Sequence, residues 1–274
     1  MRFRIVPIIE VLLLALAVGY GSVVLLAWMG QERLLFHPRP IEGPAVAPPG
    51  WRIEDIEFTT LDGTRLRGVL ALPPAQRPPL VIYFGGNAEE VTSLASMAQS
   101  FYGQRAVLYV NYRSYGASEG SPGEAQLVSD GQELFDWALH RQDIDASRIA
   151  VHGRSLGTGV AVQVAATRPA RCVVLTSAFL SAREVARHLY WFLPVRWLLR
   201  HPFDSALRAP AMKAPALFIM GTADTLVPMW QSQQLEAAWG GPHEHLVLDG
   251  FGHNDVHVNP RYSEAIRAFL DRNL

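Results

Sequence analysis

Residues 151–159 read VHGRSLGTG, a glycine-rich segment around a single serine. Its centre, Gly153-Arg-Ser155-Leu-Gly157, has the form G-x-S-x-G and lies between an apolar segment that predicts a strand and one that predicts a helix. On so sharp a turn a serine adopts a strained backbone conformation that lifts its hydroxyl above the sheet. Glycines flank it because a side chain at either place would collide with the neighbouring strand or helix. Ser155 is therefore a candidate nucleophile, although the same pattern also fits a purely structural turn.

Short apolar runs alternate with segments of helical spacing around this turn. Runs that are typical of strands buried on both faces occupy residues 79–84, 106–110, 149–151, 172–175 and 216–220. Helical spacing occupies residues 89–101, 124–139, 156–167, 231–239 and 261–270. Ahead of them, alternating patterns at 53–58 and 66–70 predict an antiparallel hairpin. The order predicts an α/β fold with a mostly parallel central sheet and helices on both faces.

The composition excludes several classes of function. The chain has 274 residues, of which 49% are hydrophobic and 18% charged, enough for one sizeable core. Its formal net charge of -1, without runs of Lys or Arg, gives no electrostatic basis for binding nucleic acid. Cys172 is the only cysteine, which excludes an internal disulfide and a cysteine metal cluster. We expect neither a cofactor nor a metal ion.

The amino-terminal segment differs from the rest of the chain. Residues 11–30 carry no charged side chain, and a helix of about 20 residues spans the hydrocarbon of a bilayer. Trp28, near the far end, suits the lipid–water boundary. We predict a membrane anchor over residues 1–36, with its transmembrane part at about 7–30. A cleaved signal peptide ending near Ala17 and a buried core helix are the alternatives.

The orientation of this anchor is weakly encoded. Arg2 and Arg4 favour a cytoplasmic amino terminus and an extracytoplasmic catalytic domain, whereas Arg33 and Arg39 oppose it. Residues 37–50 contain five prolines and predict an extended linker. The catalytic domain is then expected at 51–274. Within it, residues at about 178–208 form an insertion rich in large apolar side chains, which predicts a lid over the site.

Partners for Ser155 follow in the required order. A serine hydroxyl needs a base, and the base needs an acid that fixes its tautomer. Asp224 follows the predicted strand 216–220, and His253 follows the short apolar segment 245–248. Each therefore lies at the carboxyl edge of a strand, where open α/β sheets place their sites. Alone, Asp224 also fits a helix cap and His253 a surface or packing residue, but together the three predict a catalytic triad.

Two neighbours of the histidine are weaker candidates for the acid. Asp249 and Asp255 lie too near His253 in sequence to be its obvious partner, although Asp255 would serve if the loop folded back. For the oxyanion hole we predict the backbone N–H groups of Leu156, directly after the serine, and of Asn87 in the loop after strand 79–84. The alternative for Asn87 is a helix cap.

Five motifs together resemble one family. FGGNAEE (84–90), NYRSYGASEGSPGE (111–124), GRSLGTG (153–159), GTADTLVP (221–228) and GFGHND (250–255) are similar to those of the membrane-anchored α/β-hydrolase-domain serine hydrolases. That branch includes lysophospholipases and protein depalmitoylases. The resemblance covers roughly residues 50–274. It implies an α/β-hydrolase fold, with Ser155 as nucleophile, Asp224 as acid, His253 as base, and Leu156 and Asn87 as oxyanion donors. Many relatives have His-Gly-Asn-Ala where this chain has Gly85-Gly86-Asn87-Ala88, a change that leaves the backbone donor in place.

The expected function is that of a membrane-tethered serine hydrolase acting on carboxylic or thio esters. An apolar lid beside a serine and a membrane anchor suggests acyl or lipid-type substrates, with ordinary helix packing as the alternative for the lid. A serine peptidase or an acyltransferase with the same triad is the second hypothesis. A catalytically silent membrane scaffold is the third, from outside enzymology.

Overall fold

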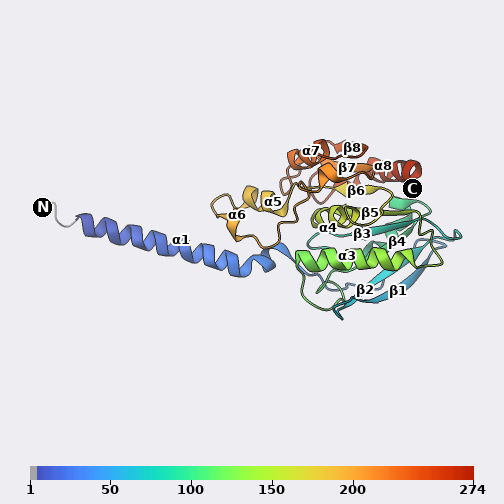
Figure 1. Cartoon of the computed structure of the whole chain (residues 1–274), viewed down its shortest axis with the longest axis horizontal. Helices are drawn as coiled ribbons and strands as arrows, with labels where there is room; N and C mark the ends of the chain where they lie inside the picture. The colour runs from blue at the N-terminus through green and yellow to red at the C-terminus, as the bar shows by residue number, and fades with distance from the viewer. Residues whose placement is uncertain (1–4) are drawn as a thin grey trace.

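A long amino-terminal helix projects from an α/β domain (Figure 1). The computed structural model describes residues 5–274. Helix α1 (Ile5–Leu35) contains the segment Ile8–Leu35, which is long and apolar enough to cross a membrane, a property that signal sequences share. Arg2 and Arg4, on which the expected orientation rests, lie outside the described residues. Residues 36–51 are neither helix nor strand and connect α1 to the sheet.

An eight-stranded sheet has the order β1-β2-β4-β3-β5-β6-β7-β8. Strands β1 and β2 pair with each other antiparallel, β2 pairs antiparallel with β4, and the remaining pairs are parallel. The strands are β1 (Arg52–Thr59), β2 (Arg65–Leu72), β3 (Leu80–Phe84), β4 (Ala106–Val110), β5 (Ile149–Arg154), β6 (Val173–Thr176), β7 (Ala216–Gly221) and β8 (His243–Leu248). The predicted fold class, hairpin and buried parallel strands are confirmed.

Helices cover both faces of this sheet because successive strand residues point to opposite faces. In β3, Leu80 and Ile82 belong to one hydrophobic cluster and Val81 and Tyr83 to the other. The first cluster includes residues of α3 (Glu124–Leu139), α4 (Leu156–Ala165) and α7 (Met229–Ala237). The second includes residues of α2 (Ala98–Tyr102) and α8 (Pro260–Asn273). The apolar runs in the sequence therefore reflect burial on both sides.

One predicted helix is wrong in form. Residues 89–101 contain a 3₁₀ helix, η1 (Thr92–Met97), followed by the short α2, in place of a continuous α-helix. Side chains accept from the backbone at its start: Glu90 accepts from the N–H groups of Thr92 at 3.0 Å and Ser93 at 3.1 Å, and Asn111 Oδ1 accepts from Val91 N at 3.0 Å. Such bonds compete with the helical pattern, so regular helix begins later.

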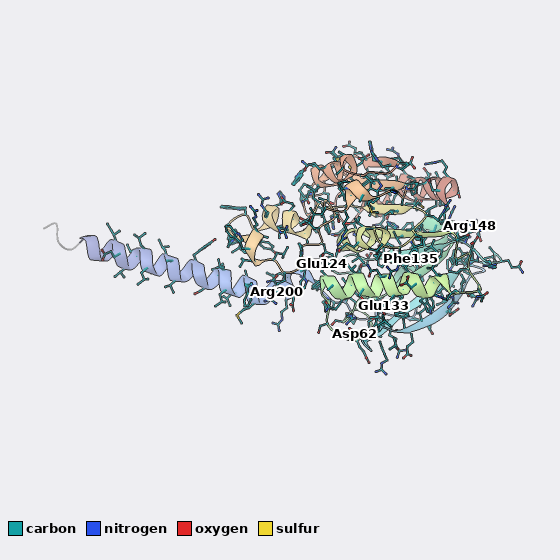
Figure 2. The ribbon with its side chains drawn as sticks, in the orientation of Figure 1. Asp62, Glu124, Glu133, Phe135, Arg148 and Arg200 are labelled. Atoms are coloured by element: carbon teal, nitrogen blue, oxygen red, sulfur yellow. The ribbon has the colours of Figure 1, made fainter. Side chains whose placement is uncertain are left out.

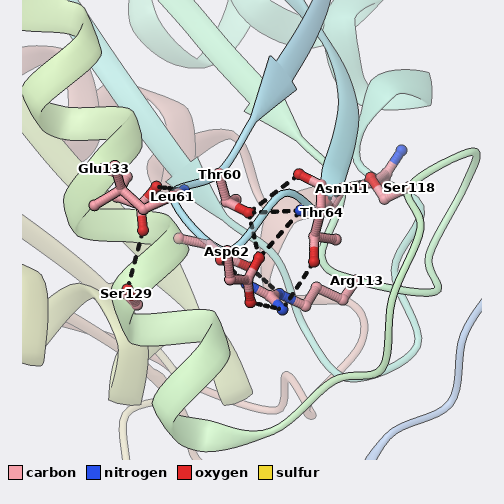
Figure 3. Close-up of polar contacts among 10 residues, drawn as sticks. Thr60, Leu61, Asp62, Thr64, Asn111, Arg113, Ser118, Ser129 and Glu133 are labelled. Carbon is pink, nitrogen blue, oxygen red and sulfur yellow. Dashed lines mark hydrogen bonds and ion pairs between the residues drawn. The ribbon is translucent and has the colours of Figure 1, made fainter.

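Polar contacts hold the loop after β4 in place (Figure 3). Arg113 donates to both oxygens of Asp130 on α3, at 2.8 and 2.6 Å, and to Asp62 in the β1–β2 turn at 2.7 Å. Burial raises the pKa of Asp130 even though Arg113 opposes this shift. Hydrogen bonds from Arg113 and from two threonines hold the pKa of Asp62 well below its usual value. The motif 111–124 therefore has a structural role in joining the hairpin to α3.

The insertion between β6 and β7 contains two helices, α5 (Ala182–Leu189) and α6 (Val195–Leu198), and then η2 (Ala209–Ala211). Both α5 and α6 lie beside the carboxyl-terminal end of α1 (Figure 1). Glu124 at the start of α3 accepts from Phe203 N at 2.9 Å and so fixes the chain where it returns from α6. We call residues 178–208 the lid. Another 3₁₀ turn, η3 (Val256–Val258), precedes α8.

Candidate active site

Ser155 lies between β5 and α4 in a strained conformation. Its φ of 51° and ψ of −119° fall outside the regions that L-residues commonly adopt. The neighbouring backbone lies so close that only glycine fits at positions 153 and 157. A Cβ at Gly153 would lie 2.3 Å from the carbonyl oxygen of Gly157, and a Cβ at Gly157 would lie 1.9 Å from the carbonyl oxygen of Phe84. The strand-to-helix turn predicted from the sequence therefore has the tight geometry expected of it.

The structure brings Ser155, His253 and Asp224 into one chain of contacts. His253 Nε2 lies 2.8 Å from Ser155 Oγ, and His253 Nδ1 lies 2.7 Å from Asp224 Oδ2. An ionised carboxylate only accepts, so Nδ1 carries the proton and Nε2 is free to accept from the serine hydroxyl. The three residues follow β5, β7 and β8, whose carboxyl ends lie at one edge of the sheet.

Asp224 is held ionised inside the protein. Burial alone would raise the pKa of its carboxyl, but the hydrogen bond and charge of His253 and the Val227 N–H together leave that pKa below its usual value. Asp224 Oδ1 accepts from the N–H groups of Leu226 at 3.0 Å and Val227 at 2.8 Å, while Oδ2 faces His253. It does not cap α7, whose N-cap is Pro228.

Neither competing aspartate contacts the imidazole of His253 in the described part of the chain. Asp249 accepts from the hydroxyl of Thr222 at 3.0 Å. Asp255 accepts from Gly252 N at 2.6 Å and so shapes the loop that carries the histidine. Sequence distance was therefore a sound reason to prefer Asp224 as the neighbour of His253.

The predicted oxyanion donors lie at the same site. Leu156 and Asn87 both line the pocket beside Ser155, and within residues 5–274 neither backbone N–H has a hydrogen-bond acceptor. Asn87 is held through its carbonyl, which accepts from His37 N at 2.9 Å and from the Tyr115 hydroxyl at 2.5 Å. It caps no helix, because the N-cap of η1 is Val91.

Glu89 supports the loop that lacks the histidine found in many relatives. Its Oε2 accepts from Gly86 N at 2.7 Å and from the Tyr83 hydroxyl at 3.0 Å. Its Oε1 lies 3.4 Å from Nη1 of Arg154, the residue before the serine. Arg154 in turn donates to the carbonyl of His253 at 3.2 Å. This pair joins the oxyanion loop to the histidine loop, and our sequence reasoning missed it because no local pattern connects positions 89, 154 and 253.

An apolar pocket of about 310 Å³ opens in front of Ser155. The lid contributes apolar side chains that include Val185, Leu189, Leu193 and Leu198. The opposite wall is unexpected, because Ala27, Gln31, Leu34 and Leu35 of α1 line the same pocket. We had predicted residues 1–36 as an anchor separate from the catalytic domain. These four positions have helical spacing in the sequence. Because the segment is apolar on all sides, however, the sequence does not distinguish this face of the helix from the others.

No group of three or more His, Cys, Asp or Glu side chains within residues 5–274 could hold a metal ion.

Several known proteins are similar to this chain in sequence. A family model described as X-Pro dipeptidyl-peptidase (S15 family) matches residues 62–193. The uncharacterized protein Rv2307c of Mycobacterium tuberculosis is 34% identical over 98% of this chain and 96% of its own length. The α/β hydrolase domain-containing protein WAV2 of Arabidopsis thaliana is 29% identical over 81% of each chain. This chain belongs to the α/β-hydrolase family.

Solved α/β-hydrolase structures have the same fold. An acetyl xylan esterase from Paenibacillus sp. R4 superposes with a TM-score of 0.68 at 21% identity, over 91% of this chain and 94% of that one. The esterase Pf2001 from Pyrococcus furiosus superposes with a TM-score of 0.68 at 21% identity, over 87% of this chain and 97% of that one. At such identities the likeness concerns the fold, so the chemistry of this α/β hydrolase is argued from its own site.

Proposed function

We propose that this α/β hydrolase is a membrane-tethered serine hydrolase that cleaves carboxylic or thio esters with apolar acyl groups. The observation that carries the proposal is the contact chain from Ser155 through His253 to Asp224 at the base of an apolar pocket. In this proposal residues 1–36 anchor the protein in the membrane, and residues 37–50 connect this anchor to the catalytic domain. Residues 51–274, including the lid at 178–208, form that domain, which is extracytoplasmic.

The proposed reaction has two half-reactions. Ser155 Oγ attacks the acyl carbon while its proton passes to His253 Nε2, and Asp224 stabilises the imidazolium. The tetrahedral oxyanion accepts hydrogen bonds from the N–H groups of Leu156 and Asn87. His253 then protonates the leaving alcohol or thiol, which departs and leaves an acyl-serine. Water attacks this ester with His253 again as base, which releases the acid and restores the serine.

The chemistry of the pocket supports an apolar acyl group. Most of the side chains that face Ser155 across the pocket are aliphatic or aromatic, contributed by the lid, by α1 and by the loop after β7. Binding of a hydrocarbon chain to such a surface is favourable because apolar surface on both is removed from water. A polar acyl group would find few hydrogen-bond partners there.

A peptidase is the second candidate because the matching family model is described as an X-Pro dipeptidyl-peptidase. Such a substrate carries a free amino terminus, and a buried ammonium group requires an acidic partner. The described residues that line the pocket include no aspartate or glutamate. The pocket therefore favours an ester with a neutral acyl group.

The test is turnover of a 4-nitrophenyl ester by full-length, detergent-solubilised protein, compared with Ser155→Ala. We expect turnover to vanish in the variant, and a fluorophosphonate to add its mass to Ser155 in the unmodified protein. Ser147→Ala, at an exposed serine before the amino-terminal end of β5, the end of that strand opposite Ser155, is the matched control and should retain full activity. Folded protein that neither hydrolyses esters nor reacts with the fluorophosphonate would instead be a scaffold. Cleavage of X-Pro peptides without ester turnover would identify a peptidase.

A further inference from the structure

We infer that helix α1 forms part of the substrate-binding site, and that the site receives a hydrocarbon chain from a lipid bilayer along the surface shared by α1 and the lid. This inference rests on the proposed ester hydrolysis and deepens it, because it names the source of the acyl chain and the element that binds it.

One face of α1 is built for the pocket. Ala27, Gln31, Leu34 and Leu35 follow the spacing i, i+4, i+7 and i+8, which places them on one side of a helix, and all four line the cavity in front of Ser155. A tether alone needs no such face. The lid closes the cavity from the other side, so a chain bound there contacts both elements.

Polar contacts dock this helix onto the lid at a fixed position. The side chain of Gln31, only 7% exposed, donates to the carbonyl of Leu198 at 3.1 Å and accepts from Arg200 N at 2.8 Å. Both of its polar ends are therefore paired with the lid. A buried amide with both ends paired specifies one docked geometry, since any shift of α1 leaves a polar group unpaired.

Arg200 adds a second set of contacts at the same place, where Figure 2 shows it beside the end of α1. Its guanidinium pairs with Glu32 at 3.1 Å, donates to the carbonyl of Trp28 at 3.1 Å, and lies 4.6 Å from the centre of the Trp28 ring. Arg200 therefore joins the lid to α1, and its partners come from a segment far away in sequence.

The lid follows α1 towards the bilayer. Tyr20 donates to the carbonyl of Phe192 at 2.8 Å. Tyr20 precedes Trp28 by eight residues, a distance of about 12 Å along a helix. If Trp28 marks the lipid–water boundary, as interfacial tryptophans do, the lid tip at Phe192 lies within the hydrocarbon region.

Exposed aromatic side chains on the lid fit that position. Trp191 and Trp197 are each 82% exposed, and Phe192 is 47% exposed. The lid tip lies against α1 through the Tyr20–Phe192 contact, and the large apolar side chains of α1 between Ile8 and Leu26 are also mostly exposed. Exposed apolar side chains on two adjoining elements are costly in water and stable in a bilayer. The continuity with α1 identifies the occupant as lipid.

The first test changes the α1 wall of the pocket. Ala27→Trp fills the cavity from α1, whereas Ala17→Trp makes the same change at an exposed position on the same helix. Full-length protein in phosphatidylcholine vesicles would be assayed with 4-nitrophenyl acetate, octanoate and palmitate. We expect Ala27→Trp to lower kcat/KM for palmitate by about tenfold or more relative to acetate. The larger side chain occupies the cavity and leaves no room for the longer acyl chain. Ala17→Trp should keep the ratio of the unmodified protein.

The outcomes separate this inference from the proposed function. An unchanged palmitate-to-acetate ratio in Ala27→Trp would overturn the inference and leave ester hydrolysis standing. Absence of Ser155-dependent turnover on every ester in the unmodified protein would instead refute the proposed function.

The second test locates the lid. Tryptophan fluorescence would be measured in vesicles of brominated phosphatidylcholine for the unmodified chain and for the double variant Trp191→Phe and Trp197→Phe. Bromine on the acyl chains quenches the fluorescence only of tryptophans that reach the hydrocarbon. The difference between the two emission spectra is the fluorescence of Trp191 and Trp197, and we expect it to be strongly quenched. An unquenched difference spectrum would place these tryptophans in water or against a second copy of the chain, and either result overturns the inference.

Discussion

Replacing Asp224 by asparagine isolates the electrostatic part of the proposed triad. The amide has the shape of the carboxylate and can keep the hydrogen bonds from the Leu226 and Val227 N–H groups to Oδ1. It loses the negative charge that lies 2.7 Å from His253 Nδ1. The imidazolium that forms when Ser155 attacks therefore has no counterion.

The magnitude follows from the geometry. With charge centres about 4 Å apart and an effective dielectric constant of about 20, the attraction between imidazolium and carboxylate is about 4 kcal/mol. Each 1.36 kcal/mol corresponds to about tenfold in rate, so kcat should fall by about 10³-fold. An amide NH₂ turned towards the ring would also favour the wrong imidazole tautomer, which lowers the rate further.

The assay is ester hydrolysis with active-site titration, together with thermal unfolding to verify that the variant is folded. Asp249→Asn is the control, because Asp249 accepts from Thr222 and does not contact His253. A kcat for Asp224→Asn within about tenfold of the unmodified protein would refute the reasoning. So would an equal loss in Asp249→Asn, since that aspartate has no part in the contact chain.

Two further predictions concern stability. Burial, and secondarily the charge of Arg154, lowers the pKa of His152 to about 3. Between pH ~6.5 and 3 the unfolded chain therefore binds a proton at this histidine that the folded protein does not bind. The free energy of unfolding should therefore fall as pH falls from 6.5 to 5, by about 2 kcal/mol, and His152→Gln should remove that slope in urea unfolding. An unchanged slope in the variant would assign the pH dependence to other groups. Arg113→Met leaves buried Asp130 without its partner and should cost about 3–5 kcal/mol in the same measurement. Arg65→Met removes an exposed pair with Glu119 and should cost far less. Equal losses would contradict the role given to burial.

Local sequence patterns were sufficient to predict the buried strands and the edge of the sheet that carries the site. Strands β3 to β7 were predicted because burial on both faces requires an unbroken apolar run. The positions of Asp224 and His253 could be predicted because parallel strands bring all their carboxyl ends to one edge, whatever the details of packing. Where local side chains compete with the backbone, as Glu90 and Asn111 do at the start of η1, the predicted helix was wrong.

The amino-acid sequence was sufficient to predict the α/β fold class and the order in which serine, aspartate and histidine reach the sheet edge. These depend on periodicity and chain order, which are properties of short segments. Folding alone brings α1 against the pocket and joins the oxyanion loop to the histidine loop through Glu89 and Arg154. Those contacts join residues as far apart as Gln31 and Leu198, which are separated by 167 positions. Their formation depends on how whole elements approach one another, and no local pattern of residues encodes that approach.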